Sequence, residues 1–154
     1  MEYHKTAEPA DLYYEDFSEG QELAPVEKGP MMVGHQVRWA GAADNYESEF
    51  HHDEYVAKER GLPGIILSGP LMGSYLITEV TKWLGRNARL ISFQDRNVGP
   101  TMPRDQATIT AKVVRKFMEG GKPMIEFECG VTNQKGSVTT PGGGIATIKS
   151  RAQH

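Results

Sequence analysis

A chain of 154 residues is long enough to bury a hydrophobic core without disulfide staples, and it is most simply one domain. Its charge is nearly balanced, with 17 Lys and Arg against 20 Asp and Glu, so nothing favours nucleic acid. The single cysteine, Cys129, excludes an internal disulfide framework and a multi-cysteine metal site. No apolar segment approaches the ~20 residues of a membrane span, and the polar, acidic N-terminus is unlike a secretory signal. We therefore expect a cytoplasmic globular protein that binds neither nucleic acid nor membrane.

The expected domain spans residues 12–150, preceded by a flexible arm over residues 1–11 and followed by a short tail over residues 151–154. The segment around Pro25 and Pro30 leaves room only for a short strand before the first proline or after the second. Two short helices are predicted over residues 34–45 and 54–60, the second capped by Asp53.

The longest helical pattern covers residues 66–85. Its apolar side chains recur at three- and four-residue spacings, which gives a broad apolar face, and Gly85 is a natural stop. Ser68 can cap the helix, Gly69 lets a ligand approach the backbone, and Pro70 stands where a missing N–H costs little. A buried core helix without further function fits the same pattern.

Four strand-like segments follow, over residues 90–98, 107–117, 124–132 and 137–150. Turns at 119–121 and 133–136 favour antiparallel pairing, and Pro141 with three glycines predicts a bulge or bend in the last strand. The expected fold is α+β, with a curved antiparallel sheet wrapped around the long helix. Because such a sheet has open edges, a homodimer or a paired heteromer is expected.

Acidic residues and two histidines gather between Asp44 and Glu54, around His51 and His52. Such a cluster can bind a metal, support acid/base catalysis or simply solvate a loop. Adjacent histidines point different ways and no HExxH pattern is present, which disfavours a metal. An imidazole that titrates near neutrality beside carboxylates favours acid/base chemistry.

The run from His51 to Ala57, followed by Gly61-Leu62-Pro63-Gly64 and Ser68-Gly69-Pro70-Leu71, resembles the MaoC-like hydratases and dehydratases, which include the (R)-specific enoyl-CoA hydratases. The resemblance implies the hot-dog fold, with a long helix in a five-stranded sheet and two such units paired. It also implies acyl thioester substrates on coenzyme A or acyl carrier protein, within fatty acid metabolism. No cofactor and no metal is expected.

In catalytic members of that family, an acid and a histidine act on one water that adds to an enoyl thioester. Carried onto this chain, the resemblance makes His51 the acid/base, Asp44 its partner and the Gly69 N–H the oxyanion donor, with Ser68, Gly69 and Tyr46 at the substrate. The family pattern places the acid five residues before the histidine, where this chain has Tyr46. Either a longer loop delivers Asp44, or the acid is supplied differently, or the chemistry is lost.

Three functions follow from these observations. The first is a hydratase or dehydratase acting on the 2,3 double bond of an enoyl thioester. The second is a catalytically silent thioester-binding subunit that supports an active partner, and the third is an acyl thioesterase. Fold alone does not choose among them.

Overall fold

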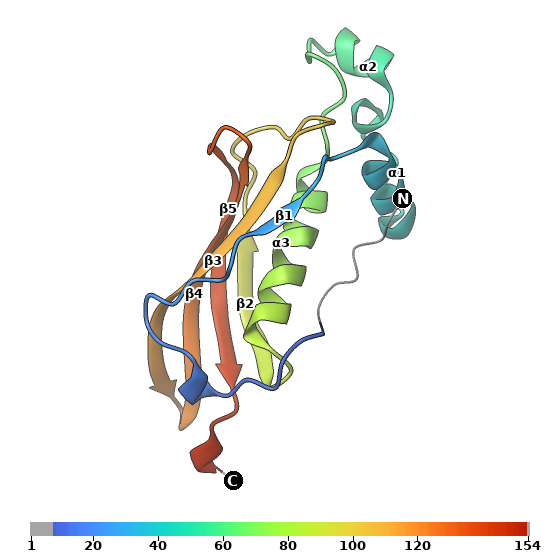
Figure 1. Cartoon of the computed structure of the whole chain (residues 1–154). Helices are drawn as coiled ribbons and strands as arrows, with labels where there is room; N and C mark the ends of the chain where they lie inside the picture. The colour runs from blue at the N-terminus through green and yellow to red at the C-terminus, as the bar shows by residue number, and fades with distance from the viewer. Residues whose placement is uncertain (1–7, 154) are drawn as a thin grey trace.

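The computed structural model describes residues 8–153, in which five antiparallel strands form one curved sheet with a long helix lying along it (Figure 1). The strands are β1 (Val26–Lys28), β2 (Ala88–Asp95), β3 (Ala107–Glu119), β4 (Lys122–Asn133) and β5 (Val138–Ile148). The helices are α1 (Val33–Ala43), α2 (Glu54–Glu59) and α3 (Gly69–Leu84), with short 3₁₀ turns at Tyr14–Asp16, Glu49–His51 and Arg151–Gln153. The predicted α+β hot-dog arrangement is confirmed.

The sheet order is β1-β3-β4-β5-β2, and every pair is antiparallel. Gly120 and Gly121 have φ values of 54° and 76°, which are the left-handed conformations that a two-residue hairpin turn between β3 and β4 requires. The second predicted turn closes through the Gly136 N–H, which donates to the Asn133 carbonyl at 2.9 Å. Local turn chemistry therefore fixes the three-stranded centre of the sheet.

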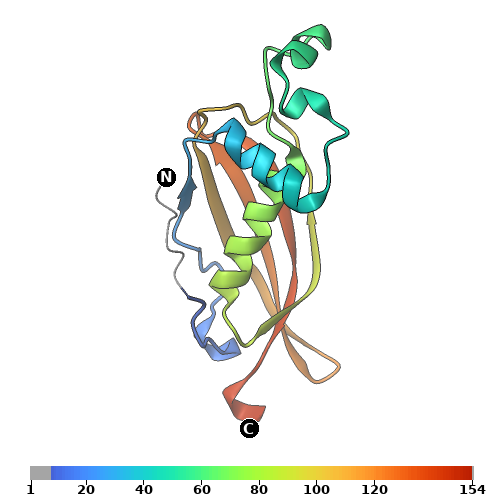
Figure 2. The ribbon, with the colours of Figure 1, turned by 90° about the vertical axis from the view of Figure 1, so that its right-hand side faces the viewer.

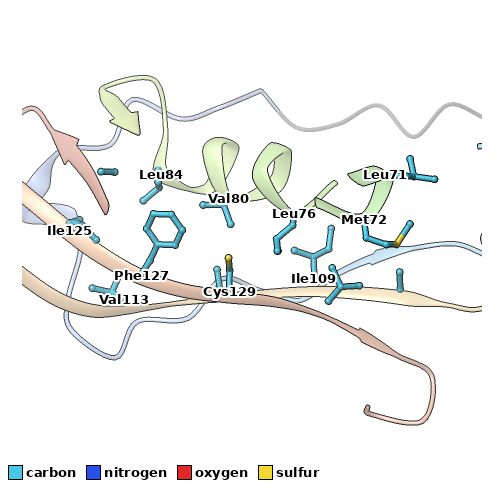
Figure 3. Packing of buried hydrophobic residues seen from close by; sticks show 14 of the residues in the cluster. Leu71, Met72, Leu76, Val80, Leu84, Ile109, Val113, Ile125, Phe127 and Cys129 are labelled. Atoms are coloured by element: carbon cyan, nitrogen blue, oxygen red, sulfur yellow. The ribbon is translucent and has the colours of Figure 1, made fainter. Parts of the chain in front are cut away.

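The core lies between α3 and the inner face of the sheet. Figure 3 shows Leu76, Val80 and Leu84 pointing from the helix toward the strands, where Val113 and Phe127 meet them. All five side chains are at most 2% exposed. Because burying one such side chain is worth ~1.5–3 kcal/mol, this contact is what holds the helix in the curve of the sheet.

Two strand predictions need correction. β1 lies between Pro25 and Pro30, rather than outside them. Three residues that pair only with β3 form an edge, so Pro25 can precede them and the Gly29–Pro30 bond can follow without interrupting a ladder.

The bulge in β5 falls at Thr139, where the pairing with β4 shifts register, and the ladder then runs without a shift through Gly142, Gly143 and Gly144. These glycines permit close approach of the neighbouring strands, since a Cβ on Gly144 would lie 2.2 Å from the Ser92 carbonyl oxygen.

The predicted short helices are both confirmed. α1 crosses the N-terminal half of α3, and α2 stands at the end of the molecule beyond the sheet (Figure 2). Trp39 fastens α1 to α3, because its indole N–H donates to the Ser74 hydroxyl at 3.1 Å. Asp53 caps α2 as expected, accepting hydrogen bonds from the Tyr55 and Val56 amides.

Of the expected N-terminal arm, residues 1–7 lie outside the described residues, while Asp11 is within 3.4 Å of the Arg86 guanidinium. Within residues 8–153, no helix is long and apolar enough to cross a membrane.

Candidate active site

The N-terminus of α3 lacks the side-chain cap that the sequence predicts. Ser68 occupies the N-cap position, but its hydroxyl makes no capping bond and is buried without a partner in the described part of the chain. Its backbone N–H instead donates to the side-chain oxygen of buried Gln36 at 2.9 Å. Among the described residues, no group accepts a hydrogen bond from the Gly69 N–H. The helix therefore presents an unused donor at its positive end, which is a setting for a negative oxygen.

His51 is fastened to the segment that enters α3. Its Nδ1 lies 2.7 Å from the carbonyl oxygen of Ile66, three residues before Gly69. A carbonyl can only accept, so Nδ1 carries the proton in this contact and the neutral ring presents an unprotonated Nε2. The ring also packs on Phe50, with centroids 4.2 Å apart. An imidazole held in one tautomer beside an uncapped helix can remove a proton from water and return it.

His52 and Tyr46 form a separate contact. Their rings meet edge to face with centroids 6.4 Å apart, so the two adjacent histidines have different partners. The Tyr46 hydroxyl packs against α1, 3.0 Å from where a Cβ on Gly41 would stand, while half of the Tyr46 side chain is exposed. In this arrangement Tyr46 contacts α1 and the loop, and its predicted contact with substrate stays a prediction.

Asp44 ends α1 in a left-handed conformation, with φ 51° and its N–H donating to the Ala40 carbonyl. Its side chain is exposed, and within residues 8–153 its carboxylate has no hydrogen bond or ion pair with His51. The structure thus brings His51 to the α3 entrance and leaves Asp44 facing solvent. The catalytic role of Asp44 remains a prediction.

Asn97 and Asp95 were missed by sequence reasoning. Asn97 covers Gly69 so closely that a Cβ there would lie 1.5 Å from its Nδ2. Asp95 covers Gly73 in the same way, with a carboxylate oxygen 2.7 Å from the corresponding Cβ position. Glycines four apart on one helix face are the only local sign of this approach, because Asp95 and Asn97 come more than 20 residues later in the chain than the glycines they cover. Two polar side chains, one from the last residue of β2 and one from just beyond it, therefore lie on the first turns of α3.

Cys129 is a packed core residue and not a nucleophile. Burial, with Asp95 and Glu128 nearby, raises the pKa of its thiol to about 12, so the thiol stays neutral at physiological pH. In the part of the chain that the structure describes, no three potential metal-ligating side chains come together.

Two hollows lie along the strands, away from the entrance to α3. A groove of about 760 Å³ follows β2 and β5, and one of about 500 Å³ lies beside β3 and β4. Neither is lined by His51, Ser68 or Gly69. These two hollows therefore do not include the candidate site.

No protein-family profile and no curated protein sequence matches the chain. Several solved structures, in contrast, are similar to the chain. The (R)-hydratase from A. caviae involved in PHA biosynthesis matches at TM-score 0.77 and 17% identity, covering 87% of this chain and 98% of its own. R-hydratase PhaJ1 from Pseudomonas aeruginosa matches at TM-score 0.79 and 17% identity, covering 92% and 88%. A chain of the ChsH1–ChsH2 complex from Mycobacterium tuberculosis matches at TM-score 0.73 and 21% identity, covering 86% and 98%.

These likenesses define the fold class. The chain has the hot-dog fold of the (R)-hydratases and MaoC-like dehydratases over nearly its whole length. At such identities the likeness concerns the fold, so activity has to be argued from the site.

Proposed function

We propose that this protein is a MaoC-like hydratase or dehydratase that adds water reversibly across the 2,3 double bond of an enoyl thioester. The observation that carries the proposal is the anchoring of His51 at Ile66, three residues before a helix whose Gly69 amide has no acceptor among the described residues. A base with a fixed tautomer and a donor for a developing negative oxygen are the two groups this reaction needs.

The reaction needs no oxidant or cofactor. His51 Nε2 takes a proton from water as the water oxygen bonds to Cβ, and the electrons of the double bond move into the thioester to form an enolate. The Gly69 N–H and the positive end of α3 stabilise the enolate oxygen. His51 then returns that proton to Cα, which completes the hydration, and dehydration follows the same path in reverse.

The test is direct. Purified protein is mixed with crotonyl-CoA, and loss of the enoyl chromophore is followed together with release of free thiol. We expect the chromophore to disappear without thiol release. Thiol release instead would indicate the thioesterase, and absence of both would contradict the hydratase.

A catalytically silent, thioester-binding subunit is the second candidate. The exposed Asp44 carboxylate, which does not contact His51, favours it, as does Tyr46 at the family's acid position. Binding of butyryl-CoA, a saturated thioester that cannot be hydrated, distinguishes the two: a silent subunit binds it but leaves crotonyl-CoA unchanged.

We further propose that the chain pairs with a second hot-dog unit, either a copy of itself or a related subunit. One edge of β2 bonds to β5, and the other meets no strand within the described residues and carries Ile91, 56% exposed. An unpaired eight-residue edge with an exposed isoleucine favours pairing. The protein from Mycobacterium tuberculosis described as having a double hotdog fold, of which this chain covers 46%, supports the arrangement. Sedimentation velocity would show a dimer, and a monomer at micromolar concentration would contradict a homodimer.

A further inference from the structure

We propose that Asn97 supplies a second hydrogen-bond donor to the thioester oxygen, beside the Gly69 amide. Because this role rests on the proposed thioester chemistry, Asn97 would be a further substrate-contacting residue at the same site. It lies two residues beyond the end of β2, far along the chain from the loop that carries His51.

The side chain of Asn97 contacts the first residue of α3, where the proposed substrate oxygen would bind. Its Nδ2 occupies the space where a side chain at position 69 would begin, 1.5 Å from the ideal Cβ. Position 69 therefore has to be glycine for Asn97 to reach the helix. Gly69 is only half-buried and Asn97 is exposed, so a ligand can reach both groups from solvent.

The orientation of the Asn97 amide is fixed from its other end. The hydroxyl of fully buried Thr140 donates to Asn97 Oδ1 at 3.1 Å. With the oxygen used in this way, the amide directs its NH₂ group toward Gly69, and that group has no hydrogen-bond acceptor in residues 8–153. An amide nitrogen carries two N–H donors, so at least one remains for a ligand.

A second, independent feature at this point indicates a missing acceptor or donor. The hydroxyl of Ser68, a residue only 3% exposed, has no partner in the described part of the chain. Buried polar groups without partners are costly and rare, and they concentrate where a ligand completes the bonding. The entrance to α3 thus holds the Gly69 N–H, the Asn97 NH₂ and the Ser68 hydroxyl, none of which is used by another group in residues 8–153.

The chemistry that fits two unused N–H donors at one helix entrance is a carbonyl oxygen that becomes negative during the reaction. Asparagine is neutral and donates, whereas an aspartate in the same place would repel the enolate. The proposal therefore predicts a sharp difference between two side chains of nearly equal size.

The experiment compares Asn97→Asp with wild type in two assays. The first measures kcat/KM for hydration of crotonyl-CoA, where a loss of roughly 10²–10³-fold is expected, as for removal of one oxyanion donor. The second measures the Kd for butyryl-CoA and for S-butyl-CoA, a thioether that lacks the carbonyl. Asn97→Asp should weaken butyryl-CoA about tenfold and leave S-butyl-CoA within about twofold.

Gln94→Glu is the matched control. It makes the same amide-to-carboxylate change on an exposed side chain of β2, three residues away, and it should leave both assays unchanged. Thr140→Val keeps the buried volume and removes the hydroxyl that orients Asn97, so an intermediate loss of about 3–10-fold is expected. An added acid near a helix N-terminus does not destabilise the helix, so Asn97→Asp should fold.

Retention of wild-type kcat/KM by Asn97→Asp, or equal weakening of thioester and thioether, would overturn the role of Asn97 while leaving the hydratase intact. A wild-type protein that binds butyryl-CoA without turning over crotonyl-CoA would overturn the hydratase, and the Kd comparison would still decide Asn97. If wild type neither turns over crotonyl-CoA nor binds butyryl-CoA, both proposals fail.

Discussion

The two ends of α3 are built in opposite ways. At the C-terminal end, the Gly85 N–H closes the last turn onto the Thr81 and Lys82 carbonyls, and the Trp83 ring packs edge to face on Phe17. At the N-terminal end, the described residues offer the Ser68 hydroxyl no partner and the Gly69 amide no acceptor, and two polar side chains lie on glycines. One end is satisfied by the fold itself, and the other leaves hydrogen-bonding capacity for something outside the chain.

This contrast separates stability from function along one helix. Satisfied polar groups and buried apolar side chains stabilise the fold, whereas unused donors lower stability and are retained where a ligand needs them. Substitutions at the C-terminal half should therefore affect unfolding, and those around the N-terminal end should affect activity with little change in folding.

The largest expected effect is at the functional end. His51→Ala removes the proposed acid/base and should lower kcat/KM for crotonyl-CoA by roughly 10²–10⁴-fold. Because His51 is only half-buried on a short turn, the free energy of unfolding should change by less than about 1 kcal/mol. Steady-state kinetics and urea denaturation measure the two quantities. His52→Ala is the control and should retain activity, so loss of activity in His52→Ala but not in His51→Ala would reverse the assignment.

On the buried face of α3, Leu76→Ala should destabilise the fold by ~2–5 kcal/mol, because the side chain is 0% exposed and its loss leaves a cavity against the sheet. Urea denaturation gives the free energy of unfolding directly. Thr78→Ala, on the exposed side of α3, should change it by no more than about 0.5 kcal/mol. Equal effects of the two substitutions would mean that the helix face is wrongly assigned.

The next prediction concerns which carboxylate assists His51 in catalysis. If the loop delivers Asp44 during catalysis, Asp44→Asn should lower kcat by about 10–100-fold, while Glu47→Gln has the smaller effect. Rates with crotonyl-CoA decide the ranking. The reverse order would indicate that the chain uses His52 with Glu47, and no effect of either would favour another acid.

The smallest expected effect concerns Glu79, a carboxylate buried in the C-terminal half of α3. Burial alone would raise its pKa, but hydrogen bonds from Lys28 and Lys82, at 2.9 and 3.0 Å, outweigh it and hold the pKa below the ordinary value of 4.5. Its stabilisation is therefore present above that ordinary value and is lost as pH falls through the lowered one.

Glu79→Gln should lower the free energy of unfolding at pH 7 by ~1–3 kcal/mol and should flatten its decline in acid. Urea denaturation at several pH values from neutral to acid measures both changes. Glu59→Gln, at an exposed position, should change neither the free energy of unfolding at pH 7 nor its decline in acid. An unchanged acid profile in Glu79→Gln would mean that the two lysines do not stabilise the carboxylate.

The sequence by itself determined the elements. The apolar spacing of α3, the glycines at 120, 121 and 85, and Asp53 before α2 act within a few residues, so their outcome follows from local backbone and side-chain chemistry. The sequence did not predict that β5 runs straight through three glycines. These glycines are required by the close approach of the neighbouring strands, which is a tertiary feature.

Only the tertiary structure decided the site. His51 finds its acceptor on Ile66 because the loop folds back 15 residues, and Asn97 reaches Gly69 because β2 ends beside the start of α3. The exposure of Asp44 likewise depends on how α1 lies across α3 and not on its spacing from His51. Hydrogen bonds within a helix or turn are set by sequence neighbours, whereas contacts between distant segments exist only once the buried core has brought those segments together.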